Sequence, residues 1–70
     1  MDETDIETID GRVVEALPST LFRIEIPGGK TIISYLGGRM RVHKIKVLVG
    51  DKVTIQIDPY GGKGRIIKRL

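Results

Sequence analysis

The sequence has no cysteine and no tryptophan, and its aromatic side chains are one histidine, one phenylalanine and two tyrosines in 70 residues. Without cysteine, neither a disulfide framework nor a cysteine-ligated zinc can support the fold, and His43 alone cannot form a structural metal site. No run approaches the roughly 18 apolar residues that a membrane-spanning helix needs, so we expect no membrane contact. A chain of this length forms one domain that buries only about 60% of its unfolded surface. Hydrophobic patterning and turns must therefore supply the folding energy.

Groups that perform catalysis are also scarce. Asp51 and Asp58 are the only acidic residues after position 26, and neither Ser19 nor Ser34 has a base partner that the sequence identifies. Gly29-Lys30-Thr31 is similar to the end of a phosphate-binding loop, but the glycine required five positions earlier is missing and a strand follows instead of a helix. The sequence therefore predicts a protein that is not an enzyme, with no catalytic residue, no metal and no cofactor.

Apolar and polar side chains alternate with the two-residue period of half-buried strands. In the segment Lys52–Asp58, for example, Ile55 lies on the apolar face and Thr54 on the polar one. Gly11 interrupts the first alternating segment and is predicted to mark a bulge or bend. We predict five strands, at residues 9–13, 22–26, 30–36, 52–58 and 64–70.

The predicted strands are separated by glycine- and proline-rich turns, and the longest connection, 37–50, contains a predicted short helical turn near its start. Five strands with an insert after the third are typical of the five-stranded Greek-key barrel called the OB fold, an all-β class. A small SH3-like barrel is the competing architecture. We expect residues 1–5 to be a disordered acidic N-terminus and residues 6–70 to form a single binding domain.

The net charge of +3 conceals an asymmetry along the chain. Residues 1–25 hold seven acidic and two basic residues, a net −5, whereas residues 26–70 hold two acidic and ten basic residues, a net +8. A basic face can serve solubility alone, but these bases cluster in two windows, 39–46 and 63–69, which favours an anionic partner. The acidic first ten residues are unlike a targeting segment, which indicates an intracellular protein.

The candidate binding residues are mainly the bases of the two windows, because guanidinium and ammonium groups pair with phosphates. For Met40, a contact with a nucleobase and a place in the core are both open. For Tyr35, stacking and partial burial are both open, and Tyr60 is expected to pack locally. In the last strand, strict alternation assigns Arg65 and Arg69 to one face and Lys68 to the other. The full set of candidates is Lys30, Tyr35, Arg39, Met40, Arg41, His43, Lys44, Lys46, Lys63, Arg65, Lys68 and Arg69.

Five short motifs occur in order, and together they resemble the bacterial translation initiation factor 1 family, which also occurs in plastids. They are Leu17–Glu25, Gly38-Arg39-Met40-Arg41, Gly50–Val53, Pro59-Tyr60 and Gly64-Arg65-Ile66. The resemblance extends from about residue 6 to 69. It implies an OB-fold factor in the A site of the small ribosomal subunit, bound to ribosomal RNA beside a ribosomal protein. There it would block premature entry of elongator tRNA and assist the other two initiation factors.

The family's RNA contacts correspond to Arg39, Met40, Arg41, Lys46 and Arg65 of this chain. The resemblance does not extend to four positions: Lys30 and Tyr35 replace a frequent histidine, Val42 a frequent lysine and Lys44 a frequent aromatic residue. It further implies a monomer when free, and a location in the cytoplasm or in the plastid stroma. Two rival functions stay open, a free OB-type RNA chaperone and a basic protein–protein adaptor.

Overall fold

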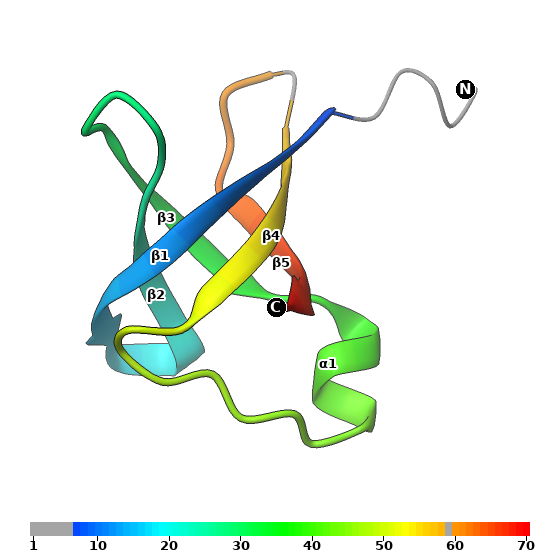
Figure 1. Ribbon diagram of the computed structural model, residues 1–70. Helices are drawn as coiled ribbons and strands as arrows, with labels where there is room; N and C mark the ends of the chain where they lie inside the picture. Colours follow the sequence, from blue (N-terminus) through cyan, green and yellow to red (C-terminus); the bar gives the residue numbers. More distant parts are fainter. Residues whose placement is uncertain (1–6, 59) are drawn as a thin grey trace.

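The computed structural model describes residues 7–58 and 60–70, so the predicted acidic N-terminus at 1–5, Ile6 and Pro59 lie outside the described residues. Five strands close into a barrel in the order β1-β2-β3-β5-β4 (Figure 1). A 3-10 turn, η2, joins the first two strands, and a short helix, α1, follows the third. The elements are β1 (Glu7–Leu17), η2 (Pro18–Thr20), β2 (Leu21–Glu25), β3 (Thr31–Leu36), α1 (Gly38–Val42), β4 (Lys52–Ile57) and β5 (Gly64–Arg69).

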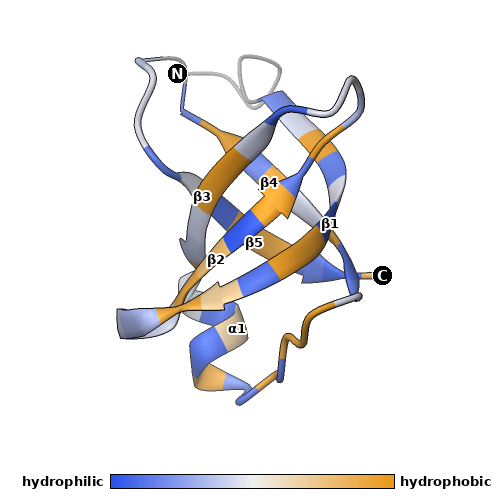
Figure 2. Cartoon of the chain, turned by 90° about the vertical axis from the view of Figure 1, so that its left-hand side faces the viewer, coloured by the Kyte–Doolittle hydropathy of each residue, from blue (hydrophilic) through white to orange (hydrophobic). Residues whose placement is uncertain are grey.

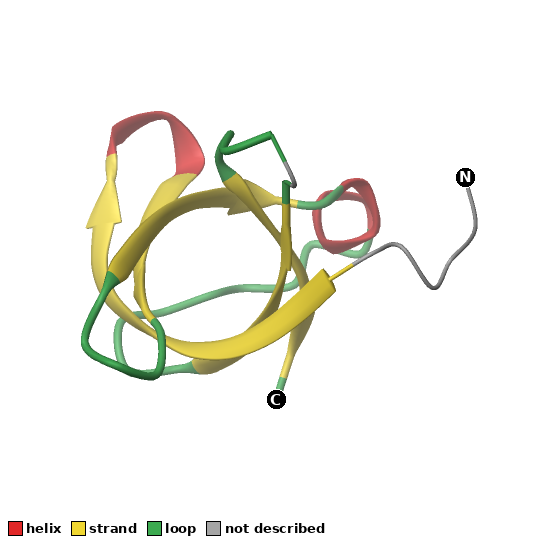
Figure 3. Ribbon diagram, turned by 90° about the horizontal axis from the view of Figure 1, so that it is seen from above, coloured by secondary structure: helices red, strands yellow, loops and turns green. Residues whose placement is uncertain are grey.

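One parallel strand pair closes the barrel. β3 and β5 run parallel from Ser34 opposite Gly64 to Leu36 opposite Ile66, whereas the other four pairings are antiparallel. Viewed from above, the strands form a ring, and α1 lies outside it (Figure 3). A closed five-stranded Greek-key barrel with a helical insert after the third strand is the predicted OB architecture, which is confirmed over the SH3-like alternative.

The predicted alternation places the core inside the ring. Along the strands, apolar and polar residues alternate between the two faces (Figure 2). Ile24, Ile55 and Ile66 are wholly buried, while their strand neighbours Arg23, Thr54 and Arg65 are exposed or partly exposed. The remaining buried apolar residues are Val13, Phe22, Met40, Val47 and Val53.

The structure of β1 corrects the expectation that Gly11 marks a bulge or bend. The register shift lies between Val13 and Glu15, so the bulged residue is Val14, and Gly11 pairs regularly with Val53. A Cβ on Gly11 would lie 2.6 Å from Cγ2 of Ile24, so glycine is needed for close packing of β1 on β2 and not for a bulge. The strand is also longer than predicted, because it pairs with β2 and β4 in succession.

β5 contains a second bulge that changes which side chains share a face. Ile66 pairs with Ile55, but Lys68 pairs with Thr54, so Ile67 is the extra residue. Opposed residues point to the same side of a sheet, and an inserted residue reverses the alternation beyond it. Lys68 therefore shares the outer face with Arg65, and the strict alternation predicted for this strand is wrong.

The segment from residue 43 to 51 runs from α1 across the lower opening of the barrel to β4 (Figures 1 and 3). Val47 is buried under the barrel and closes the core at this end. The segment is tied to β1 because Val13 donates its N–H to the Asp51 carbonyl at 2.9 Å and accepts from Gly50 at 2.7 Å. Backbone hydrogen bonds to a strand hold this connection even though it has no regular structure of its own.

A candidate nucleic-acid interface

The first part of the interface is the helix α1. Gly37 caps it in an extended conformation, and its N–H donates to the Ile66 carbonyl of β5 at 2.8 Å. Arg41 and His43 continue the hydrogen bonding with N–H donation to the carbonyls of Gly37 (3.2 Å) and Arg39 (3.0 Å). A single turn of helix is unstable alone, so its attachment to β5 determines where the side chains point.

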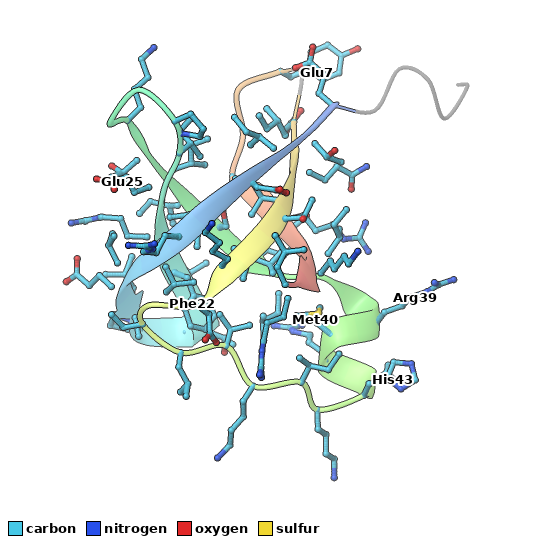
Figure 4. All side chains as sticks on the ribbon, viewed as in Figure 1. Glu7, Phe22, Glu25, Arg39, Met40 and His43 are labelled. Carbon is cyan, nitrogen blue, oxygen red and sulfur yellow. The ribbon has the colours of Figure 1, made fainter. Side chains whose placement is uncertain are left out.

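Met40 provides that attachment. The sequence left two roles open for this residue, a contact with RNA and a place in the core, and its burial decides between them. Its side chain is only 2% exposed and belongs to the core. Figure 4 shows it pointing back toward the barrel, while Arg39 and His43 project from α1 into solvent. Because a residue three or four positions along a helix returns to the same face, burial of Met40 leaves its neighbours exposed. We therefore assign Met40 to the core and not to the binding surface.

The connection after α1 continues the basic surface. Lys44 and Lys46 are both exposed, and Lys44 has a positive φ of 52° that turns the chain toward β4. The carbonyl of Lys46 accepts from Nη1 of Arg69 at 3.1 Å, and Nε of Arg69 lies 4.0 Å from Oδ2 of Asp51. Arg69 thus holds the connection against the end of β5, a structural task that the sequence did not indicate.

The outer face of β5 supplies the second part of the interface. Arg65 is exposed, and its side chain lies along the start of α1, with Nε 3.2 Å from the point where a Cβ of Gly37 would lie. Arg39 and Arg65 line one cavity of about 110 Å³, together with Gln56. Met40 and Ile67 also line it and make it partly apolar. The cavity is therefore lined by two arginines from different elements, although 26 positions separate them in the sequence (65 − 39).

A row of side chains continues across the barrel from this cavity. Tyr35 of β3 lies opposite Arg65, and Arg65 lies opposite Gln56 of β4. Tyr35 is 40% exposed, so its ring is half-covered and one part of it faces solvent. Gln56 was not a candidate, because a single glutamine on a polar strand face carries no signal in the sequence.

Two candidates lie away from this surface. Lys30 ends the β2–β3 turn and Lys63 lies in the β4–β5 loop, both at the end of the barrel opposite α1 (Figure 1). The backbone carbonyl of Lys30 accepts the Ile26 N–H at 2.9 Å, which closes the turn. The Lys30 side chain takes no part in this bond and is exposed. Tyr60 also lies in the β4–β5 loop and is 89% exposed, so the expectation that it packs locally is wrong.

The described acids of the first half lie on strands other than those of the candidate interface. They are Glu7, Asp10 and Glu15 on β1 and Glu25 on β2, whereas every basic residue from Lys30 onward is exposed outside these two strands. In the described part of the chain, the ion pairs are Arg23–Glu15 at 2.9 Å and Arg69–Asp51. The guanidinium groups of Arg39, Arg41 and Arg65 have no carboxylate partner among these residues. Their charge is available to an external anion.

Other kinds of site find no support among the described residues. Residues 7–58 and 60–70 contain no group of three or more histidine, aspartate or glutamate side chains that could hold a metal ion. Within the same ranges, no helix has the length and apolar character needed to cross a membrane. The surface around α1 and β5 is exposed and basic and its cavity is small, which suits a polyanion better than a small molecule at this place.

Comparison with known proteins relates both the sequence and the fold to one family. The model of the family described as translation initiation factor 1A / IF-1 matches residues 1–70. The solution structure of translation initiation factor 1 from the Wolbachia endosymbiont strain TRS of Brugia malayi is 34% identical. Its TM-score is 0.79, and the match covers 93% of this chain and 78% of that one.

Two larger proteins contain a similar barrel. YjeQ from Thermotoga maritima is 31% identical with a TM-score of 0.75, and the match covers 91% of this chain and 23% of that one. YloQ, a circularly permuted GTPase, is 25% identical with a TM-score of 0.78 over 91% of this chain and 23% of its own. The same barrel therefore occurs both as a small protein and as one part of longer chains.

Proposed function

The chain belongs to the translation initiation factor 1A / IF-1 family and is a translation initiation factor, and from that premise we propose that it binds ribosomal RNA at the A site of the small ribosomal subunit. There it blocks premature entry of elongator tRNA and assists the other two initiation factors. The observation that carries the proposal is that Arg39 of α1 and Arg65 of β5 line one cavity, that Arg41 is exposed on the same helix as Arg39, and that none of the three has a carboxylate partner among the described residues.

The RNA contact follows from the geometry of these groups. Arginine forks present paired N–H donors that match phosphate oxygens, and both Arg39 and Arg65 line the cavity. Lys44 and Lys46 extend the positive surface along the connection to β4. Phosphate-driven binding of this kind releases counterions and weakens as salt rises.

The mechanism that we propose is occupancy. A rigid barrel with bases on one surface binds the decoding-site RNA and prevents a tRNA from binding the same RNA, with no bond made or broken. The acidic residues of β1, which are Glu7, Asp10 and Glu15, help to orient the molecule, because phosphates repel their charge and that strand stays away from the RNA. The partners are then ribosomal RNA, a neighbouring small-subunit protein and the other initiation factors, in the cytoplasm or in a plastid stroma.

Competition for the A site tests this proposal. Elongator tRNA delivered as ternary complex to isolated small subunits should bind less as the protein is titrated in, with saturation at one protein per subunit. The effect should fade with added salt, and initiator tRNA in the neighbouring site should stay bound. Simultaneous binding of the protein and A-site tRNA, or equal loss of both tRNAs, would show that occupancy is wrong and would favour the adaptor function.

A further inference from the structure

Tyr60 is the most exposed of the large hydrophobic residues in the described part of the chain, at 89%. The sequence has only three residues of the phenylalanine, tyrosine and tryptophan type, and they differ widely in exposure. Phe22 is buried at 8% and Tyr35 is half-covered at 40%. The fold therefore leaves one complete aromatic ring in solvent, where it contributes nothing to the core.

The backbone beneath this ring is held in place by Asp58. Oδ1 of Asp58 accepts the Tyr60 N–H at 2.8 Å, and the Asp58 carbonyl accepts the Gly61 N–H at 3.1 Å. Gly61 has a φ of +82°, and a Cβ on Gly62 would collide with the Asp58 carboxylate. The loop conformation thus depends on these two glycines, and the ring projects from an anchored backbone position.

After two glycines, basic residues follow Tyr60 along the chain. Lys63 and Arg65 are both exposed, and Arg65 belongs to the basic surface beside α1. The β4–β5 loop is one of the loops through which OB barrels contact oligonucleotides. An exposed ring followed by two cations is the combination that binds a single strand, since the base stacks on the ring while the cations pair with the backbone.

We propose that Tyr60 stacks on an unpaired nucleobase of the RNA and that Lys63, in the same loop, contacts a phosphate beside it. This contact lies at the end of the barrel opposite α1, and Arg65 contacts the same RNA beside α1, so the RNA is bound at two places joined by β5 (Figure 1). Asp58 is the positioning residue, because its carboxylate holds the backbone of Tyr60. This inference rests on the proposed RNA-binding function and adds an aromatic contact to it.

Fluorescence offers a direct test, because the chain has no tryptophan. A Tyr60→Trp variant carries a single indole at the proposed contact. Its emission should be quenched when a short single-stranded oligoadenylate or isolated small subunits are added, and a fully paired RNA duplex should quench it much less. Val14→Trp, on β1 away from the basic surface, is the matched control and should keep its emission.

Affinity at graded salt separates stacking from charge. Tyr60→Ala should weaken binding to the same oligoadenylate by roughly 5- to 150-fold at every salt concentration, and Tyr60→Phe should bind like the wild type. Lys63→Ala should instead reduce the log–log salt slope by about 0.7, as expected for one lost phosphate contact on a single strand. A changed slope for Tyr60→Ala, or wild-type affinity for it, would overturn the stacking inference.

Asp58 is tested with two variants that remove the same charge. Asp58→Asn keeps a side-chain oxygen that accepts from the Tyr60 N–H, whereas Asp58→Ala does not. Asp58→Ala should therefore bind oligoadenylate more weakly than Asp58→Asn, and the difference should vanish in a Tyr60→Ala background. If Tyr60→Ala binds normally while Arg41→Ala fails, only the stacking inference is wrong. If the wild-type protein binds neither RNA nor small subunits, the proposed function is wrong and this inference with it.

Discussion

The backbone N–H of Gly37 donates to the Ile66 carbonyl oxygen at 2.8 Å, which joins the start of α1 to the middle of β5. A Cβ on Gly37 would lie 2.8 Å from that same oxygen and 3.2 Å from Nε of Arg65. Main-chain atoms of a paired strand cannot move aside as a flexible side chain can. The absence of a side chain at Gly37 therefore determines how closely the bases of α1 approach Arg65.

Gly37→Ala is expected to destabilise the protein by about 1 to 3 kcal/mol, because the added methyl group forces α1 away from β5. It should also weaken RNA binding by separating Arg39 from Arg65. Gly38→Ala is the matched control, since its Cβ would meet nothing nearer than Nη2 of Arg65 at 3.9 Å. Alanine is the better helix former by roughly 0.5 to 1 kcal/mol, so this variant should be neutral or slightly stabilised. Urea unfolding of both variants measures the difference, and equal shifts would contradict the close approach.

Ile55→Ala is expected to cost roughly 2 to 5 kcal/mol, because the side chain is wholly buried at the centre of the barrel. In a domain of this size that loss could unfold much of the population. Thr54→Ala should cost less than about 1.5 kcal/mol, since it removes only the exposed hydrogen bond from Oγ1 to Asp10 at 2.7 Å. Thermal unfolding compares the two, and similar melting temperatures would mean that the register of β4 is wrong.

Arg41→Ala should weaken binding to small subunits and lower the log–log salt slope by about 0.7 to 0.9, the value for one lost phosphate contact. Arg23→Ala is the control, because it removes the same single positive charge from β2, where Arg23 is exposed and paired with Glu15. Its slope should stay near that of the wild type. Co-sedimentation at graded salt gives both slopes. If the two variants lose affinity equally, net charge governs binding and the surface around α1 has no special part in it.

Ser34 and Gly64 face each other across the parallel pairing of β3 and β5, and a Cβ on Gly64 would lie 2.6 Å from Oγ of Ser34. That hydroxyl is buried and has no hydrogen-bond partner among the described residues. Gly64→Ala should therefore be destabilising in the wild type by about 1 to 3 kcal/mol. In a Ser34→Ala background the obstructing oxygen is gone, and the same change should cost less. A double-mutant cycle by urea unfolding measures the coupling, and additive effects would mean that the two side chains do not compete for space.

Most of the fold could be predicted because strand alternation is local information. Ile24, Ile55 and the residues in phase with them identify the inner face from the sequence alone, since only one register buries an apolar face. The five strands begin and end within a few residues of their predicted bounds, apart from the longer β1. The family was likewise recognisable, because its short motifs follow one another at fixed intervals along the chain.

The candidate site was less predictable, since its residues come from separate elements. Lys68 joins Arg65 on the outer face only because Ile67 bulges, and a bulge depends on the pairing of β5 with β4. Met40 lies in a short helical turn, and packing of that turn against the barrel determines which of its sides is buried. In the sequence, Arg69 looks like the other clustered basic residues, but in the structure its guanidinium group donates a hydrogen bond to the Lys46 carbonyl.

The strand pattern, the separation of acidic and basic halves and the family all follow from the order and spacing of residues along the chain. Which basic residues line one cavity, and which aromatic ring is exposed, depend instead on the three-dimensional fold. Arg39 and Arg65 line the same cavity because β3 and β5 close the ring and the Gly37 N–H donates to the Ile66 carbonyl. Tyr60 is exposed because Asp58 holds the backbone of its loop at the end of the barrel opposite α1, where none of the described side chains covers the ring. Contacts between distant segments depend on closure of the whole barrel, and no local pattern in the chain encodes them.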